Sequence, residues 1–293
     1  MKQFFSACAI FLATISTAQA ATVLTSIKPI QLIATEIAQG INTPDVLLSS
    51  NTSPHDYALR PSDVKRIQSA DLVIWYGQDL EPFLGKILDG RAKVLTLSQI
   101  PDLALREYVQ GNHSHEGHDH GSYDSHFWLG YLPTKQVAQA IALAMADADP
   151  QHRSQYLTNL ASFNHQLEQQ HQAIKQQLAP IKARGYYVFH DAYGYFEQDY
   201  GLNHLGYFTI SPDRKPGAKT LISIRKALSG NDVYCLFTEP QFTPAVVQSV
   251  TRGSDTNIGV LDPIGSDIEV KPGGYFTFKQ QLADSFSHCL SSD

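Results

Sequence analysis

The chain has 293 residues, of which 43% are aliphatic, aromatic or cysteine and 17% are charged, and its formal net charge is −6 at pH 7. This composition is typical of a folded globular protein and excludes a disordered chain. The acidic balance excludes the basic surface that nucleic-acid binding requires, so no nucleic-acid partner is expected.

The first twenty residues have the pattern of a secretory signal peptide. Lys2 precedes an apolar run from Phe4 to Ile15, and Ala18-Gln19-Ala20 has the small-x-small form of a cleavage site. The run is shorter than the about 20 apolar residues that span a bilayer, and no later segment reaches that length. We therefore expect residues 1–20 to be cleaved and the mature protein to be exported, soluble and not membrane-spanning.

After cleavage, 273 residues (293 − 20) remain, more than one hydrophobic core usually serves, so we expect two domains. The first part of the mature chain alternates short apolar runs with amphipathic stretches, which is typical of β-α units with a parallel sheet. The predicted strands are Thr22–Ile27, Asp45–Leu48, Leu72–Tyr76 and Val94–Leu97, and the predicted helices are Ile30–Gln39 and Pro61–Ser69. An N-terminal lobe is therefore expected over residues 21–150, including a polar loop at residues 110–125.

A long helix is predicted in the middle of the chain. Between Gln151 and Ala179 there is neither Gly nor Pro, and apolar residues recur at spacings of three, four and seven. At about 1.5 Å per residue such a helix would extend roughly 43 Å, enough to cross from one lobe to another. We assign residues 151–180 to this connecting helix.

After Pro180 the β-α alternation resumes. The predicted strands are Tyr186–Phe189, Leu205–Thr209, Val233–Thr238 and Ile258–Leu261. A C-terminal lobe is therefore expected over residues 181–293. The predicted fold class is α/β, with two lobes that each contain a parallel sheet.

Two cysteines remain after cleavage, because Cys8 lies inside the apolar run of the signal peptide and Cys235 and Cys289 lie in the C-terminal lobe. An even pair in an oxidising compartment suggests one disulfide. Closing a loop of this length would stabilise the fold by roughly 4 kcal/mol on the chain-entropy model. Two free buried thiols are the alternative.

Three of the twelve histidines lie beside predicted strands at positions where ligands collect. His55 follows a strand after a short loop, His126 precedes Phe127-Trp128-Leu129, and His190 closes a strand. Asp262 closes another strand in the same way. In open α/β sheets ligands bind at the carboxyl ends of strands. Imidazole suits Zn²⁺, which favours four ligands including nitrogen, whereas Mn²⁺ prefers more oxygen.

The segments around these residues carry a more specific pattern. They read SPHDYALRPSD at residues 53–63, DSHFWL at 124–129, FHDAYGYF at 189–196, TEPQF at 238–242 and LDP at 261–263. In this order they resemble the metal-binding and C-terminal segments of the zinc-binding subunits of bacterial ABC importers, the ZnuA type. The resemblance covers essentially the whole mature chain.

The resemblance implies two α/β lobes joined by one long rigid helix, with the metal in the cleft between the lobes. By the same resemblance, His55 and His126 come from the first lobe and its edge, and His190 comes from the second. Manganese-type relatives generally carry a carboxylate where this chain has His190, so the histidine argues for zinc. Cys235 and Cys289 match the positions of the family's disulfide in the second lobe.

The function implied is a periplasmic protein that captures Zn²⁺ as a transported ligand. It would deliver the ion to an inner-membrane ABC permease driven by a cytoplasmic ATPase, and we expect it to be a monomer and not an enzyme. One departure from the family leaves the coordination incomplete, because some zinc members place Glu where this chain has Pro54. Asp262 is the candidate for the fourth ligand and a water molecule is the rival. Asp262 could instead orient a histidine from outside the coordination shell.

Four further histidines, His113, His115, His118 and His120, lie within eight positions together with two acids. Short His-rich tracts bind metals, and this one resembles a short version of the acidic His-rich loop of the ZnuA group. We expect it to be mobile and to serve as an auxiliary, weak metal site. A solvated loop without a metal role is the alternative.

Three other functions are compatible with some of these features. The first is an importer subunit for Mn²⁺ or Fe²⁺, because ligands and not the fold decide the cargo. The second is an adhesin on the same scaffold, although the sequence shows no lipid anchor. The third is a zinc-dependent hydrolase or lyase, since three histidines and an open position also describe catalytic zinc. The chain contains no His-Glu-x-x-His helix and no Gly-x-Ser-x-Gly turn, which argues against the third.

Overall fold

The computed structural model describes residues 20–50, 52–55, 57–107, 123–209, 216–230, 232–240, 245–254 and 256–291. The predicted signal peptide, apart from Ala20, lies outside the described residues, and so do the four histidines between residues 113 and 120. Within the described residues, no helix has the length and the apolar character needed to cross a membrane.

The first lobe contains a four-stranded parallel sheet. Its strands are β1 (Val23–Thr25), β2 (Asp45–Val46), β3 (Leu72–Trp75) and β4 (Val94–Thr96), in the order β2-β1-β3-β4. Its helices are α1 (Lys28–Ile37), α2 (Pro61–Ser69) and α3 (Gly85–Leu88), with 3₁₀ turns at Pro82–Leu84 and Leu97–Gln99. α1 begins two residues earlier than predicted, because Pro29 lies in its first turn, where its fixed φ favours a helix.

The second lobe contains a sheet with the same topology. Its strands are β5 (Gly185–His190), β6 (His204–Thr209), β7 (Val233–Thr238) and β8 (Asn257–Val260), all parallel and in the order β6-β5-β7-β8. Its helices are α6 (Gly194–Tyr200), α7 (Ala218–Leu228), α8 (Ala245–Thr251) and α9 (Gly274–Ser291). The prediction of two α/β lobes with parallel sheets is confirmed.

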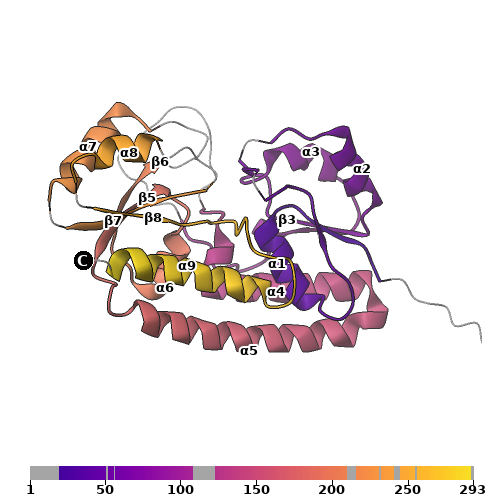
Figure 1. The fold of residues 1–293 in the computed structure, drawn as a ribbon. Coiled ribbons are helices and arrows are strands. Elements are labelled where there is room, and N and C mark those ends of the chain that lie inside the picture. The colour runs from indigo at the N-terminus through magenta and orange to yellow at the C-terminus, as the bar shows by residue number, and fades with distance from the viewer. Residues whose placement is uncertain are drawn as a thin grey trace, which may run out of the picture.

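Two long helices, α4 (Tyr131–Ala148) and α5 (Arg153–Leu178), run between the lobes. Figure 1 shows α5 extending beneath both sheets, and it packs along α4 and against α1 and α9. The long helix is confirmed, although it is preceded by a 3₁₀ turn at Pro150–His152. Phe163, Leu167, Ile174 and Leu178 form its buried stripe, whereas Leu157 is 39% exposed.

The lobes share their largest apolar core. This cluster includes Ile30 of α1, Ile141 of α4, Ile174 of α5 and Phe286 of α9. A polar contact adds to it, because the buried carboxylate of Glu36 in α1 accepts the backbone N–H groups of Gly273 and Tyr275 at 3.0 and 3.2 Å. An acid from the first lobe therefore satisfies free amides at the start of α9, where helices need acceptors.

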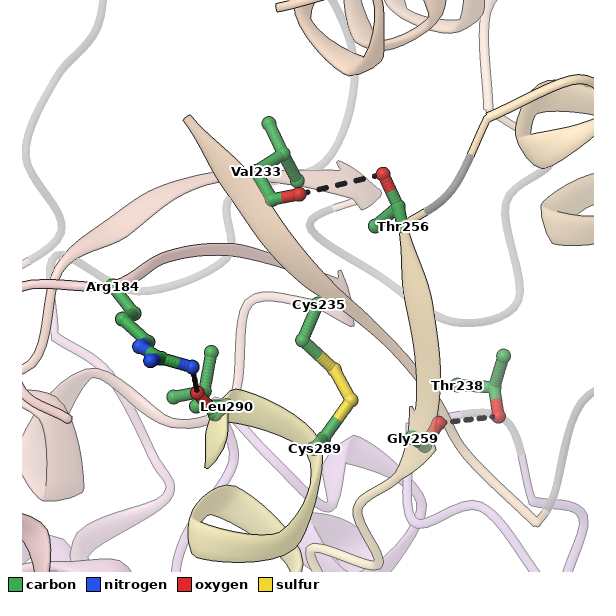
Figure 2. Close-up of a disulfide and its surroundings, with 8 residues drawn as sticks. All are labelled: Arg184, Val233, Cys235, Thr238, Thr256, Gly259, Cys289 and Leu290. Atoms are coloured by element: carbon green, nitrogen blue, oxygen red, sulfur yellow. Dashed lines mark hydrogen bonds between the residues drawn. A yellow bond between two sulfur atoms is a disulfide. The ribbon is translucent and has the colours of Figure 1, made fainter. Parts of the chain in front are cut away.

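The predicted disulfide is present. Cys235 of β7 and Cys289 of α9 are bonded, with their Cα atoms 5.9 Å apart, and both side chains are buried (Figure 2). Gly259 of β8 leaves room beside the disulfide, because a Cβ at that position would lie 2.7 Å from the Phe237 ring and 3.0 Å from the Cys289 sulfur. Near the end of α9, Arg184 donates a hydrogen bond to the carbonyl of Leu290 at 2.6 Å. The second lobe is thus fixed to its C-terminal helix at two points.

Candidate metal centre

Three histidines that are far apart in the sequence meet between the lobes. His55 lies in the loop between β2 and α2, His126 precedes the 3₁₀ turn Phe127–Leu129, and His190 is the last residue of β5. One nitrogen of each ring lies within 4.8 Å of the corresponding nitrogen of the other two. In a tetrahedral zinc site such nitrogens are roughly 3.4 Å apart, so small side-chain movements would place all three on one ion.

The rings differ in burial. His126 and His190 are each 3% exposed, whereas His55 is half-buried and lies on the open side of the cluster. The ring centres of His126 and His190 are 5.0 Å apart, and the centre of the His55 ring lies 5.8 Å from that of His126 and 5.5 Å from that of His190. A ligand entering from solvent would therefore meet His55 first and the buried pair behind it.

The ring of His126 is oriented by a buried carboxylate. Asp124, which is fully buried, has its Oδ1 atom 2.8 Å from Nδ1 of His126 and also accepts the backbone N–H of His126 at 3.0 Å. The carboxylate places the ring proton on Nδ1, which leaves the lone pair of Nε2 for a metal. The other oxygen of Asp124 forms an ion pair with Nη1 of Arg106 at 3.1 Å.

The ring of His190 is held neutral in the apolar interior. Burial lowers its pKa well below the ordinary value, and the neighbouring His126 lowers it further, against the opposing charge of Asp124. Its Nε2 atom is buried and has no hydrogen-bond partner among the described residues. A buried nitrogen with a free lone pair, in a ring that resists protonation, is suited to bind a metal ion.

A second buried acid lies beside His190. Glu239, one residue after β7, has its Oε1 atom 3.7 Å from Nδ1 of His190 and accepts the hydroxyl of Tyr193 at 3.2 Å. Burial raises the pKa of Glu239 to about 8. Sequence reasoning assigned no partner to this acid. Only the folded arrangement of β5 and β7 shows its relation to the histidine.

Asp262 lies outside the group of three histidines whose nitrogens are within 4.8 Å of one another. It follows β8, and its carboxylate accepts the backbone N–H groups of Ile264 and Ser266. The same turn is tied to the first lobe, because Trp128 donates its indole N–H to the carbonyl of Pro263 at 2.7 Å. Asp262 is therefore held at the junction of the lobes.

Sequence reasoning also gave no role to Asp124 and Arg106. The position of Asp124, two residues before His126, is a usable signal, because a metal-binding histidine commonly donates its second ring N–H to a carboxylate. Arg106 gives no such signal. It is separated from Asp124 by residues 108–122, which lie outside the described part of the chain.

Comparisons with known proteins identify the family of this chain. The family model described as zinc-uptake complex component A, periplasmic, matches residues 23–289. The high-affinity zinc uptake system protein ZnuA of Yersinia pestis is 41% identical, over 99% of this chain and 98% of that protein. The protein of the same name from Haemophilus influenzae is 37% identical, over 99% of this chain and 100% of its own length.

Solved structures show the same fold. A crystal structure of ZnuA superposes with a TM-score of 0.75 at 25% identity, covering 91% of this chain and 99% of that one. A laminin-binding adhesin of Streptococcus agalactiae superposes with a TM-score of 0.78 at 20% identity, covering 92% of this chain and all of the adhesin chain. At that identity the adhesin shows the fold alone.

Proposed function

The chain belongs to the family of periplasmic zinc-uptake components, and from this premise we propose that it captures Zn²⁺ with His55, His126 and His190 and delivers it to an ABC permease. The observation that carries the proposal is the convergence of three imidazoles, two of them buried, at the junction of the lobes. Nitrogen-rich sites with few ligands favour zinc, whereas Mn²⁺ is usually bound by more oxygen atoms.

For the fourth coordination position we propose Asp262 or a water molecule. The carboxylate of Asp262 already accepts two backbone N–H groups, so a shift toward the histidines would weaken those hydrogen bonds. A water molecule would enter beside His55, on the open side, without such a cost. Replacing Asp262 by Ala separates the two, because a direct ligand would cost far more zinc affinity than a residue outside the coordination shell.

We propose capture without catalysis. A zinc hydrolase needs a general base positioned to activate a metal-bound water. Glu239 is a buried acid whose Oε1 atom lies 3.7 Å from Nδ1 of His190 and accepts the hydroxyl of Tyr193, so its carboxylate is already engaged and is a poor candidate for that base. A turnover assay of the zinc-loaded protein with ester and peptide substrates tests this, and sustained turnover would contradict it.

Export, assembly and the auxiliary loop complete the proposal. Residues 1–20 act as a cleaved signal peptide, the mature protein acts as a monomer, and it docks on an inner-membrane permease that is driven by a cytoplasmic ATPase. The histidines between residues 113 and 120 form a weak auxiliary zinc site. Support comes from the sequence pattern and from the family of periplasmic zinc-uptake components.

The decisive experiment is a calorimetric zinc titration of metal-stripped mature protein, with His190→Ala as the test variant and His165→Ala as its matched control. His165 is exposed on α5 and is not a member of the three-histidine cluster. One tight site that is lost in His190→Ala and kept in His165→Ala is expected. A variant without residues 113–120 should keep the tight site. Tight binding by His190→Ala, or displacement of zinc by equimolar Mn²⁺, would contradict the proposal.

A further inference from the structure

Arg106 occupies a special place beside the three histidines. It lies in the first lobe, its side chain is 21% exposed, and Nη1 forms the ion pair with Asp124, the carboxylate that orients His126. The backbones of the two residues are also paired, because the N–H of Asp124 donates to the carbonyl of Arg106 at 2.8 Å. A backbone contact and a side-chain contact therefore hold the two residues against each other.

The guanidinium of Arg106 also contacts the second lobe. A Cβ atom placed on Gly194, the first residue of α6, would lie 2.2 Å from the Cζ and Nη1 atoms of Arg106. The absence of a side chain at this position is therefore what allows the guanidinium to lie against the start of α6. Gly194 is four residues after His190, and Arg106 precedes His126 in the chain. Their contact therefore joins the segments that carry these two proposed ligands.

A tyrosine of α6 reinforces the bridge. The hydroxyl of Tyr195 accepts the backbone N–H of Arg106 at 2.9 Å and donates to the backbone carbonyl of Asp124 at 2.7 Å. Both donor and acceptor functions of this buried hydroxyl are thereby used by the Arg106–Asp124 pair. The position of the pair is consequently fixed relative to the second lobe.

The charges around Arg106 come from both lobes. Burial would lower the pKa of the guanidinium, but Asp124, Asp191 and Glu197 raise it above the ordinary value. These acids are 0%, 7% and 8% exposed. Buried carboxylates need a nearby cation, and a planar guanidinium can face more than one of them.

We propose that Arg106 is a positioning residue of the metal site, which fixes Asp124 against His126 and ties this histidine to the lobe that carries His190. The proposal rests on the function proposed above. Arg106 does not touch the ion. With Asp124 held by Arg106, His126 keeps its proton on Nδ1 and presents Nε2 to the ion. Without Arg106, the buried Asp124 would lose its cation and could rotate away from the ring.

The experiment compares Arg106→Gln and Arg106→Lys with a matched control, Arg153→Gln. Arg153 is the first residue of α5, and in the parent protein its guanidinium forms an exposed ion pair with Asp147. Zinc affinity is measured by competition with a chelator of known affinity. The tautomer of His126 in the metal-free protein is measured by long-range ¹H–¹⁵N NMR. Thermal unfolding of the metal-free protein reports the structural contribution separately.

Arg106→Gln is expected to weaken zinc binding by roughly 10- to 100-fold, the range found when a group that orients a metal ligand is removed. His126 should then populate both tautomers. Arg106→Lys should recover part of the affinity because it keeps the charge, and Arg153→Gln should behave as the parent protein. Gly194→Ala is a second variant that keeps Arg106 but displaces its guanidinium, and it should weaken binding in the same direction.

Two results would overturn the proposal. One is zinc affinity in Arg106→Gln equal to that of Arg153→Gln. The other is weaker binding with an unchanged His126 tautomer and a lower unfolding temperature, which would make Arg106 a residue of the fold alone. His126→Ala, titrated in parallel, separates these results from a failure of the zinc site itself. Undiminished zinc binding by His126→Ala would overturn the proposed site and this inference together.

Discussion

The two lobes have the same strand order but hold their histidines differently. Strands of the first lobe are two to four residues long, and the proposed ligands that it carries, His55 and His126, lie in loops. Strands of the second lobe are four to six residues long, and His190 is part of β5 itself. A loop histidine needs side-chain contacts to fix its ring, whereas a histidine in a central strand is placed by the sheet.

The largest expected effect comes from removing the strand histidine. His190→Ala should reduce zinc affinity by at least about 100-fold, more than the loss of an orienting group, because it removes a preplaced ligand. His55→Ala should cost less, since His55 is half-buried and a water molecule can take its place. Chelator competition measures both. An equal loss in the two variants would show that the lobes do not differ in this way.

The next largest effect distinguishes the two buried acids that lie beside the buried histidines, Asp124 beside His126 and Glu239 beside His190. Asp124→Asn should weaken zinc binding by roughly 10- to 100-fold, because Asp124 contacts Nδ1 of His126 at 2.8 Å. Glu239→Gln should weaken it less, because Glu239 is 3.7 Å from Nδ1 of His190, which the strand already positions. The same competition assay ranks the two. A larger loss in Glu239→Gln would reverse the comparison.

The disulfide gives a difference in stability between the lobes. The double variant Cys235→Ser/Cys289→Ser should lower the free energy of unfolding by about 2–4 kcal/mol, since the unfolded chain gains freedom without the cross-link. Urea unfolding measures this loss. Amide hydrogen exchange should become faster in β7 and α9 but not in β1 and β3. Equal acceleration in both lobes would mean that the disulfide stabilises the shared core.

The smallest effect concerns His204, whose Nδ1 lies 3.1 Å from Oε2 of Glu197. Burial lowers its pKa, but the hydrogen bond and the charge of Glu197 raise it more, so the pKa lies above the ordinary value. A raised pKa stabilises the fold below about pH 6.5, and this contribution is lost as the pH rises through the folded value.

His204→Gln should therefore destabilise the protein at pH 5.5 by about 1 kcal/mol, the typical net contribution of one hydrogen bond, and the difference from the parent should shrink on going to pH 9. Urea unfolding at the two pH values measures it. His165→Gln, an exposed histidine on α5, is the control and should show no such change. A constant loss at both pH values would assign the effect to packing.

The sequence predicted both sheets, because short apolar runs alternate with amphipathic segments. It also predicted α5, because apolar residues recur there at helical spacing. It did not identify α4 or α9, although the apolar spacing of Tyr275, Phe278, Leu282 and Phe286 was available as a signal. The buried stripe of α5 also excludes Leu157, because only the fold decides which side of a helix is covered.

For the site, the structure brings together His55, His126 and His190, which the sequence singled out. Local spacing could have indicated Asp124. Arg106 and Glu239 could not be found in that way, because their partners are set by contacts between distant segments. Arg106 reaches α6 only where Gly194 leaves room, and Glu239 meets His190 only because β7 lies beside β5.

Zinc-edge X-ray absorption on the 1:1 zinc complex, recorded with and without residues 113–120, tests the three-histidine site most directly. We expect the same spectrum for both proteins, with three imidazole nitrogens and one oxygen at about 2.0–2.1 Å from zinc. Fewer than three imidazoles, or a spectrum that loses imidazoles when residues 113–120 are deleted, would contradict it.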